Sequence, residues 1–386
     1  MRVSSHAILW LLGSFVRIFL QLRRTNASGT SEGFTVFGYL PEYRLKNFDY
    51  EGAFQTGLTH LIYFSLEIDT ERYVPSALDR LPSPQDLEKA KEAAKKVNGK
   101  IMLSFGGNAR SQGFSNMVAK RKRRLHFLKS LNKFLTEQDL HGVDYNWEYP
   151  KNAMEWKNWG KLMKESKEML LGGKNVVSFT MYNDPNHFKV IQAFDLLSHA
   201  DYLHCMVYDM RGEHSTVAFA RHALELAKDA ELKMDYSKWT LGLPFYGRNV
   251  HTGEAKAFSE LKPRNNVSNM EHDVFYNSQE TLATKVRMAM DEGVGGVMIW
   301  ELGQDKQPFA RPESLLWAVH SALPAVTDFV PAAAEEGKEV SATFTAPSSI
   351  TNAAAEGMQN QGEGPLAEEK GDGEVQLGVS EIHDEI

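Results

Sequence analysis

Residues 100–149 read KIMLSFGGNARSQGFSNMVAKRKRRLHFLKSLNKFLTEQDLHGVDYNWEY and contain one complete strand–helix–strand unit. Two short runs rich in β-forming residues, 100–107 and 142–149, enclose a helical pattern over 124–136. The leucines of that pattern recur on one face, at Leu125, Leu128, Leu131 and Leu135. A strand that reaches a second strand through a helix runs parallel to it, with a right-handed crossover. The segment therefore predicts an α/β fold.

The same alternation continues on both sides of this unit, from residue 34 to residue 323. Eight apolar runs have the length and composition of strands covered on both faces: 34–40, 58–68, 100–107, 142–149, 175–182, 201–209, 239–247 and 294–302. Helical patterns between them place apolar residues on one face, in 86–97 (Leu87, Ala90, Ala94, Val97) and in 154–170 (Trp156, Trp159, Met163, Leu170). Eight such units predict a closed (β/α)8 TIM barrel.

An open, doubly wound sheet is the alternative architecture for alternating strands and helices. Such a sheet normally has a glycine-rich phosphate loop after its first strand. The first run here continues into FGYLPEYR (37–44), which contains no loop of that kind. The sequence therefore favours the barrel.

The fourth run, within HGVDYNWEYP (141–150), carries the most informative polar residues. Asp144, Asn146 and Glu148 are two residues apart, which places all three on one face of a strand. The intervening Tyr145 and Trp147 face the opposite side, toward the helices. Catalytic residues of such barrels lie at the carboxyl ends of the strands, and inward carboxylates are costly without partners. We therefore interpret the three residues as a catalytic constellation, with an internally satisfied polar cluster as the alternative.

This segment resembles the signature of glycoside hydrolase family 18, the chitinase-like enzymes, whose fourth strand reads D-G-x-D-x-D-W-E-Y-P. Four further motifs occur in the order typical of that family: LSFGG (103–107), MVYD (206–209), GLPFYGR (242–248) and GGVMIWELGQD (295–305). The resemblance covers nearly all of residues 34–323, and five ordered motifs make it specific. It implies a TIM-barrel glycosidase. We expect no cofactor and no metal, because no His/Cys/Asp cluster has ligand spacing.

The resemblance also implies a role for the residues that close the strands. Glu148 would protonate the leaving oxygen and then deprotonate water, while the N-acetyl oxygen of the sugar replaces a second carboxylate as nucleophile. Tyr208 would hydrogen-bond the acetamide, Asp209 would contact the sugar, and Trp300 would stack beneath its distorted ring. The remaining candidates are Asp144 and Asn146 in the catalytic set, and Met206, Gly106, Tyr39, Phe64, Tyr182, Tyr246 and Arg248 in the substrate-binding set. The aromatic members of the second set are equally well explained as core residues.

Two positions depart from the family signature. His141 replaces its first Asp and lies deeper along the strand, so we expect it to be peripheral. Asn146 replaces the Asp that orients the acetamide and stabilises the charged intermediate. Asparagine keeps an acceptor and a donor of the same size but brings no charge.

The expected function is hydrolysis of β-1,4-linked N-acetylglucosamine, in chitin oligomers or in the chitobiose core of N-glycans. The partner is therefore an N-acetylglucosamine-containing oligo- or polysaccharide. A chitinase-like lectin, catalytically weak or inactive because of Asn146, is the alternative from another functional class. The stretch between Arg248 and Gly295 is too short for the α+β domain that many chitinases insert after strand seven, so we expect a barrel without it.

The charge is unevenly distributed along the 386-residue chain, whose net charge is −7. Thirteen acidic residues and two lysines fall after Ala325, which leaves the barrel region near neutral. We expect no nucleic-acid partner, since that would need clustered basic residues on one face. The basic run 120–124 is interpreted as a solvated helix start. The single cysteine, Cys205, lies in an apolar stretch and is expected to be a buried core residue.

The two ends have different compositions from the middle. Residues 1–27 resemble a secretory signal peptide, with an uncleaved anchor as the alternative; Arg17 interrupts the apolar run, so no stable membrane span is expected after signal removal. Residues 326–386 are acidic and poor in large apolar side chains, which predicts disorder. They end in HDEI, similar to the HDEL retrieval signal. These features predict the secretory pathway, with secretion or retention in the endoplasmic reticulum lumen, and a sequon at Asn266 predicts a glycan. The HDEI ending alone would also suit a lumenal chaperone-like protein.

Overall fold

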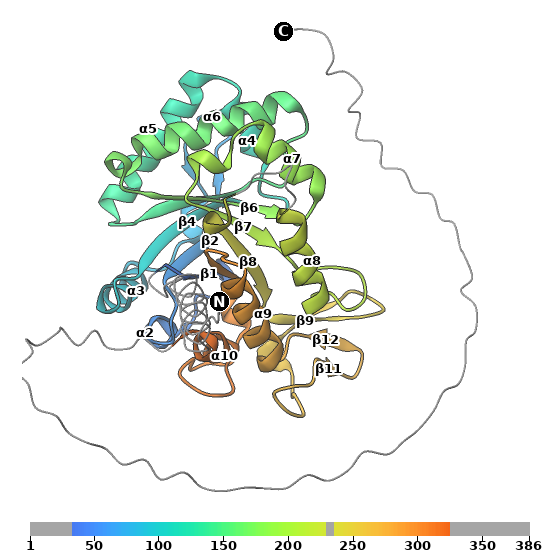
Figure 1. Cartoon of the computed structure of the whole chain (residues 1–386). Helices are drawn as coiled ribbons and strands as arrows, with labels where there is room; N and C mark the ends of the chain where they lie inside the picture. The colour runs from blue at the N-terminus through green and yellow to red at the C-terminus, as the bar shows by residue number, and fades with distance from the viewer. Residues whose placement is uncertain (1–32, 229–234, 325–386) are drawn as a thin grey trace, which may run out of the picture. The chain divides into compact units, whose positions relative to one another are not determined.

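The computed structural model describes residues 33–228 and 235–324. Within these ranges eight parallel strands pair in the order β1, β13, β8, β7, β6, β5, β4, β2, and pairing of β1 with β2 closes the ring (Figure 1). The barrel strands are β1 (Thr35–Pro41), β2 (His60–Ile68), β4 (Lys100–Gly106), β5 (Gly142–Asn146), β6 (Val176–Tyr182), β7 (Tyr202–Met206), β8 (Trp239–Pro244) and β13 (Gly296–Trp300). Closure confirms the predicted (β/α)8 barrel over the open sheet. The predicted leader (1–27) and acidic tail (326–386) lie outside the described residues.

Helices follow the strands and surround the barrel (Figure 1). The α-helices are α2 (Tyr50–Gln55), α3 (Pro84–Lys96), α4 (Gln112–Val118), α5 (Arg121–Glu137), α6 (Ala153–Met169), α7 (Pro185–Ala193), α8 (Val217–Ala227), α9 (Gln279–Asp291) and α10 (Leu315–Ala322). Short 3-10 helices are η1 (Glu42–Arg44), η2 (Leu78–Arg80), η3 (Leu170–Gly173), η4 (Leu197–His199), η5 (Tyr236–Lys238), η6 (Phe258–Glu260) and η7 (Leu302–Gln304). In the described part of the chain, no helix combines the length and apolar character needed to cross a membrane.

Two helix-face predictions were wrong at their edges. Val97 is 44% exposed, because α3 ends at Lys96 and Val97 serves as its C-cap outside the apolar stripe. Leu125 is only half-buried, because α5 turns Arg124 and Phe127 toward the core instead. The basic run 120–124 does begin a helix, but Arg124 is buried. Its guanidinium donates to both carboxylate oxygens of Glu165 on α6, at 2.7 and 2.9 Å, so this arginine is structural rather than solvated.

A small antiparallel sheet lies between β8 and α9, and the sequence patterns did not predict it. Its strands are β9 (Tyr246–Asn249), β10 (Ala255–Ala257), β11 (Met270–Glu271) and β12 (Val274–Tyr276), paired in the order β10, β9, β12, β11. A further two-residue strand, β3 (Pro75–Ser76), pairs with the end of β2. The described residues between β8 and α9 contain no α-helix, so the barrel lacks a large inserted α+β domain, as predicted.

The apolar side chains form two separate clusters. The larger cluster fills the space between the strands and the helices and includes Tyr145, Trp147 and the buried Cys205. The smaller cluster consists of buried residues from β1, β2, β4, β6, β9, β13 and the loop after β7: Phe37, Tyr39, Ile62, Met102, Val176, Tyr208, Tyr246 and Met298. Alternate side chains of a barrel strand face its interior, so we assign this second cluster to the inside of the barrel. It carries several of the predicted site residues.

Candidate active site

Glu148 lies two residues beyond the end of β5 and is half-buried. Its backbone N–H donates to the hydroxyl of Ser111 at 3.2 Å. Burial raises the pKa of Glu148, the side chain of Asn146 lowers it, and the negative charge of Asp209 raises it; the net change is upward. A raised pKa keeps a carboxyl group protonated closer to neutral pH, which is what a general acid requires.

Asn146 ends β5 and is buried, with a side chain that is only partly satisfied. Its amide lies near the carboxyl group of Glu148 and lowers the pKa of that group, while its Oδ1 is buried and has no hydrogen-bond partner in the described part of the chain. Buried carbonyl oxygens nearly always have a donor. Asn146 therefore presents a free acceptor beside Glu148, suited to an N–H group of a ligand.

Gly106 supports Asn146 rather than adding a side chain to the site. It has φ +98°, and a Cβ there would lie 2.3 Å from the backbone oxygen of Asn146. The neighbouring Gly107 N–H donates to that same oxygen at 2.6 Å. Only glycine fits this close approach between β4 and β5 without displacement. In the structure Gly106 holds the end of β5 in place. Its role in substrate binding stays a prediction.

Asp144 lies deeper inside the barrel and is fully buried. Its carboxylate accepts hydrogen bonds from Tyr39 at 2.9 Å and from Ser104 and Ser178 at 2.8 Å each. Burial raises the pKa of Asp144, and these hydroxyl groups, with that of Thr180, act in the opposite direction. An internally satisfied polar cluster, the alternative for the whole constellation, describes Asp144 well. It does not describe Glu148.

Aromatic side chains from several strands pack together near Asp144, whose carboxylate is hydrogen-bonded by Tyr39. Phe64 and Trp300 pack edge to face with ring centroids 4.6 Å apart, and Tyr39 lies 5.5 Å from Trp300. Tyr39 is buried, whereas Phe64, Met206 and Trp300 are only partly buried and adjoin the same interior cluster. Partly exposed rings at the strand ends are the type of surface on which a pyranose ring stacks. The structure thus brings together the predicted residues of β1, β2, β7 and β13.

Asp209 lies just beyond β7 and binds two residues of β9. Tyr246 donates its hydroxyl to Asp209 Oδ1 at 2.5 Å, and Arg248 Nε donates to the same oxygen at 2.6 Å. Burial raises the pKa of Tyr208, and the charges of Tyr246, Asp209 and Glu148 raise it further. The charge of Asp209 also raises the pKa of Tyr182, after burial. The charge of Asp209 therefore acts on three neighbouring groups, Glu148, Tyr182 and Tyr208.

Comparison with known protein families agrees with a barrel that carries Glu148 at the carboxyl ends of its strands. The family model of the glycosyl hydrolases family 18 matches residues 35–305. The chain belongs to this family. It is therefore a glycoside hydrolase, and the predicted resemblance is confirmed. The matched range begins with β1 and ends just after η7, so the family 18 domain and the closed barrel coincide.

Relatives of known identity share about a quarter of their residues with this family 18 chain. "Probable chitinase 2" of Drosophila melanogaster is 25% identical over 347 residues, covering 69% of this chain and 70% of the relative. The class V chitinase of Arabidopsis thaliana is 23% identical, covering 56% and 73%. The crystal structure of a GH18 chitinase from Flavobacterium johnsoniae has 25% identity and a TM-score of 0.63, covering 75% of this chain and 94% of that one.

Three residues of the family 18 site were missed in the sequence. Ser111 holds the backbone of Glu148 from the loop after β4. His214 is buried against Tyr246, with its Nδ1 3.8 Å from Asp209, and burial lowers its pKa to about 4. Lys285 of α9 is fully buried. It donates to the carbonyl and hydroxyl oxygens of Ser215, the residue after His214, at 2.9 and 2.8 Å. None of the three belongs to a spaced motif, so no pattern in the sequence indicates them.

Among residues 33–228 and 235–324, no group of three or more His, Cys, Asp or Glu residues is arranged to hold a metal ion. His141, the other departure from the signature, precedes β5, and its Nδ1 accepts the backbone N–H of Ile101 at 3.1 Å. That bond lies at the start of the strands, away from Glu148.

Proposed function

We propose that this family 18 chain hydrolyses β-1,4-linked N-acetylglucosamine in chitin oligomers, with Glu148 as the acid and base. The observation that carries the proposal is the half-buried carboxyl group of Glu148, which lies beside Asn146 and has a pKa raised by burial and by the charge of Asp209. The relatives named above as chitinases support the same substrate class. The chitobiose core of N-glycans contains the same linkage and is the second substrate to examine.

The nucleophile in this proposal is the N-acetyl oxygen of the substrate. A retaining glycosidase that uses a protein nucleophile needs a second free carboxylate about 5 Å from the acid. Asp144 is fully buried among hydroxyl donors, and Asp209 is engaged by Tyr246 and Arg248. Neither is free to attack an anomeric carbon. The acetamide of the sugar then attacks as Glu148 protonates the leaving oxygen, and Glu148 subsequently removes a proton from water.

Asn146 and Tyr208 would position that acetamide. The free Oδ1 of Asn146 would accept the acetamide N–H, which turns the acetamide oxygen toward the anomeric carbon. Among the described residues, the hydroxyl of Tyr208 has only the sulfur of Met298 as a partner, at 3.8 Å, and it would donate to the acetamide oxygen. Trp300 would support the distorted ring from below. Each group acts by preorganised hydrogen bonding or stacking, so the site is built before substrate arrives.

A sugar-binding protein without turnover is the second candidate, and Asn146 favours it. An amide cannot supply the negative charge that stabilises an oxazolinium ion, so the transition state loses stabilisation. The fold does not decide the matter, because a chitinase-like agglutinin from Robinia pseudoacacia has a similar fold, with a TM-score of 0.58 at 18% identity. The retained Glu148 argues for hydrolysis, since binding alone has no need of a general acid.

Release of a chromophore from a chitobioside and a chitotrioside, in wild type and in Glu148→Gln, separates the two candidates. Hydrolysis predicts turnover in wild type that Glu148→Gln abolishes, with oligosaccharide binding intact in both. Binding without turnover at any pH would establish the lectin instead. A glycopeptide with an intact chitobiose core, assayed in parallel, distinguishes the two substrates.

A further inference from the structure

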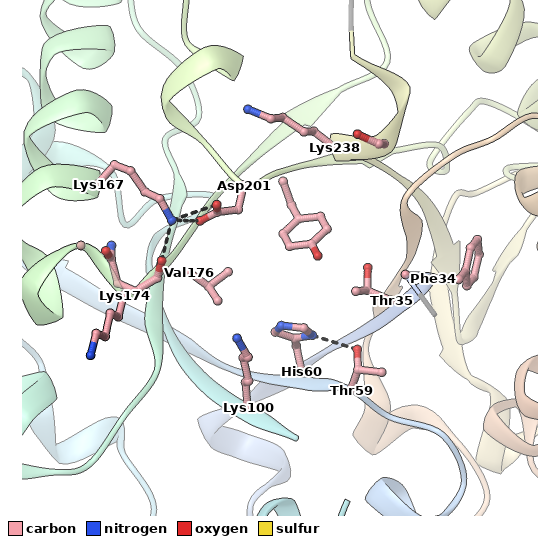
Figure 2. A pocket seen from close by; sticks show the side chains of 15 residues that line it. Phe34, Thr35, Thr59, His60, Lys100, Lys167, Lys174, Val176, Asp201 and Lys238 are labelled. Carbon is pink, nitrogen blue, oxygen red and sulfur yellow. Dashed lines mark hydrogen bonds and ion pairs between the residues drawn. The ribbon is translucent and has the colours of Figure 1, made fainter. Parts of the chain in front are cut away.

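A cavity of about 760 Å³ lies at the opposite end of the barrel from Glu148. Its lining includes the first residues of several strands, namely Thr35 of β1, His60 of β2, Lys100 of β4, Val176 of β6 and Tyr202 of β7 (Figure 2). Because the barrel strands are parallel, their starts share one end, and catalytic groups occupy the other. This basal cavity is therefore separate from the glycosidase site.

Lysines dominate the charge of the basal cavity. Lys100, Lys167, Lys174 and Lys238 line it, whereas Asp201 is the one carboxylate among the lining residues that the structure describes. Lys167 neutralises that carboxylate, donating to both oxygens at 2.9 and 2.7 Å. Figure 2 shows the Lys167–Asp201 pair on one side of the open space and Thr35 and Thr59 on the other. Lys238 donates to the backbone oxygen of Leu197 at 3.0 Å. Lys100, Lys174 and Lys238 therefore have no carboxylate partner among the described lining residues.

Lys100 and Lys174 have donors to spare. Neither ammonium group makes a hydrogen bond or an ion pair with the residues that the structure describes, and each carries three donors. Both lysines also line a second, adjoining cavity of about 260 Å³, together with His141 and Asp139. Lysines that surround a concavity repel one another more than lysines spread over a convex surface, because low-dielectric walls concentrate their field. A bound anion would relieve this repulsion.

The remaining lining indicates a small organic ligand rather than a bare ion. The volume is within the range of ligand pockets, about 300 to 1,000 Å³. Phe34 and Tyr202 contribute aromatic surface, and Thr35, Thr59 and Ser237 contribute hydroxyl groups. Lysine binds phosphate as a point charge and does not require the planar geometry that an arginine–carboxylate pair uses. The lining contains no arginine.

We propose that the basal cavity is a binding site for a small organic molecule bearing phosphate or sulfate groups, held by Lys100, Lys174 and Lys238. The site would act independently of Glu148. Phosphate and sulfate esters present the same tetrahedral oxyanion to these lysines, so pyrophosphate and sulfate serve as separate probes of the source.

Calorimetric titration of the full chain with pyrophosphate, and in parallel with sulfate, tests the proposal. Lys100→Met and Lys174→Met remove single charges that make no hydrogen bond or ion pair with the described residues, and Lys129→Met removes an exposed α5 lysine outside both cavities. We expect saturable binding that weakens about tenfold or more in each cavity variant, given the strength of hydrogen bonds to charged groups, and that is unchanged in Lys129→Met and Glu148→Gln. Preference for pyrophosphate would identify a phosphorylated ligand, and equal binding a general oxyanion site. Absence of saturable binding of either probe, or equal weakening in Lys129→Met, would overturn the proposal. Chromophore release is measured on the same variants, so that loss of anion binding is distinguished from loss of glycosidase activity.

Discussion

The side-chain amide of Asn146 lies near the carboxyl group of Glu148, two residues farther along the chain, and lowers the pKa of that group. The amide favours the ionised form of Glu148, whereas burial and the charge of Asp209 favour the protonated form. The protonation of the acid therefore depends on burial and on two neighbouring side chains, Asn146 and Asp209. Both side chains are accessible to substitution.

Replacing Asn146 by aspartate should speed turnover. A carboxylate would supply the negative charge that stabilises the oxazolinium cation, and one preorganised polar group is worth about 3 kcal/mol in a transition state, so a gain of about a hundredfold in kcat is expected. A second negative charge would also raise the pKa of Glu148 and move the alkaline limb of the rate profile to higher pH. Steady-state kinetics across pH measures both effects. Unchanged rates and an unchanged profile would mean that Asn146 does not act on the reacting sugar.

Replacing Asp209 by asparagine should move the alkaline limb in the opposite direction. A general acid works while protonated, so activity falls as pH rises through its pKa. The charge of Asp209 raises the pKa of Glu148, and its removal lowers that pKa, by up to about one pH unit. The measurement is kcat/KM against pH for both proteins. A limb that stays in place would separate Asp209 from the titration of Glu148.

Replacing Gly106 by alanine should damage catalysis as well as stability. The new Cβ would meet the backbone oxygen of Asn146 at 2.3 Å, on a residue with φ +98°. Displacement of Asn146 should lower kcat by about tenfold or more, since small misplacements of catalytic groups are costly. Gly293→Ala is the matched control, because Gly293 has φ +74° but no atom within 4 Å of the new Cβ. It should lose about 1 kcal/mol of stability from backbone strain and keep full activity. Equal effects of the two variants on kcat would refute the positioning role of Gly106.

The buried Lys285 should make stability depend on pH in the alkaline range. Its ammonium donates to Ser215 and to Asn277 Oδ1, the latter at 2.7 Å. Burial lowers its pKa to about 7, compared with about 10.4 in an unfolded chain. Between these values the unfolded chain binds the extra proton, so the free energy of unfolding rises with pH, by at most about 1.4 kcal/mol per unit. Lys285→Met should remove this contribution, which denaturant titrations of both proteins between pH 7 and 9 would measure by difference. A difference that does not vary with pH would contradict the lowered pKa.

The barrel could be predicted from the sequence because its strands are uniformly apolar and regularly separated. Strand ends and the small β9–β12 sheet were harder, since strands of two to four residues carry too little pattern. Arg124 shows the limit for helices. The sequence predicts an exposed arginine, and only the structure shows that it is buried against Glu165 on the next helix.

Some residues of the site could be predicted from the sequence, and others could not. The two-residue spacing indicated Asp144, Asn146 and Glu148 together; the structure places Asp144 and Asn146 in β5 and Glu148 two residues beyond its end. Ser111 contacts Glu148, and His214 packs on Tyr246; both pairs join segments far apart in sequence, which spacing does not reveal. The basal lysines are a second example, because they become neighbours only when the barrel closes.

The most direct test of the account is the rate of chromophore release from a chitotrioside by wild type and by Glu148→Gln, with oligosaccharide binding measured on both. The account predicts turnover by wild type, loss of turnover by about a thousandfold or more without the proton donor, and unchanged binding. Equal rates in the two proteins would show that the carboxyl group of Glu148 does not carry the reaction.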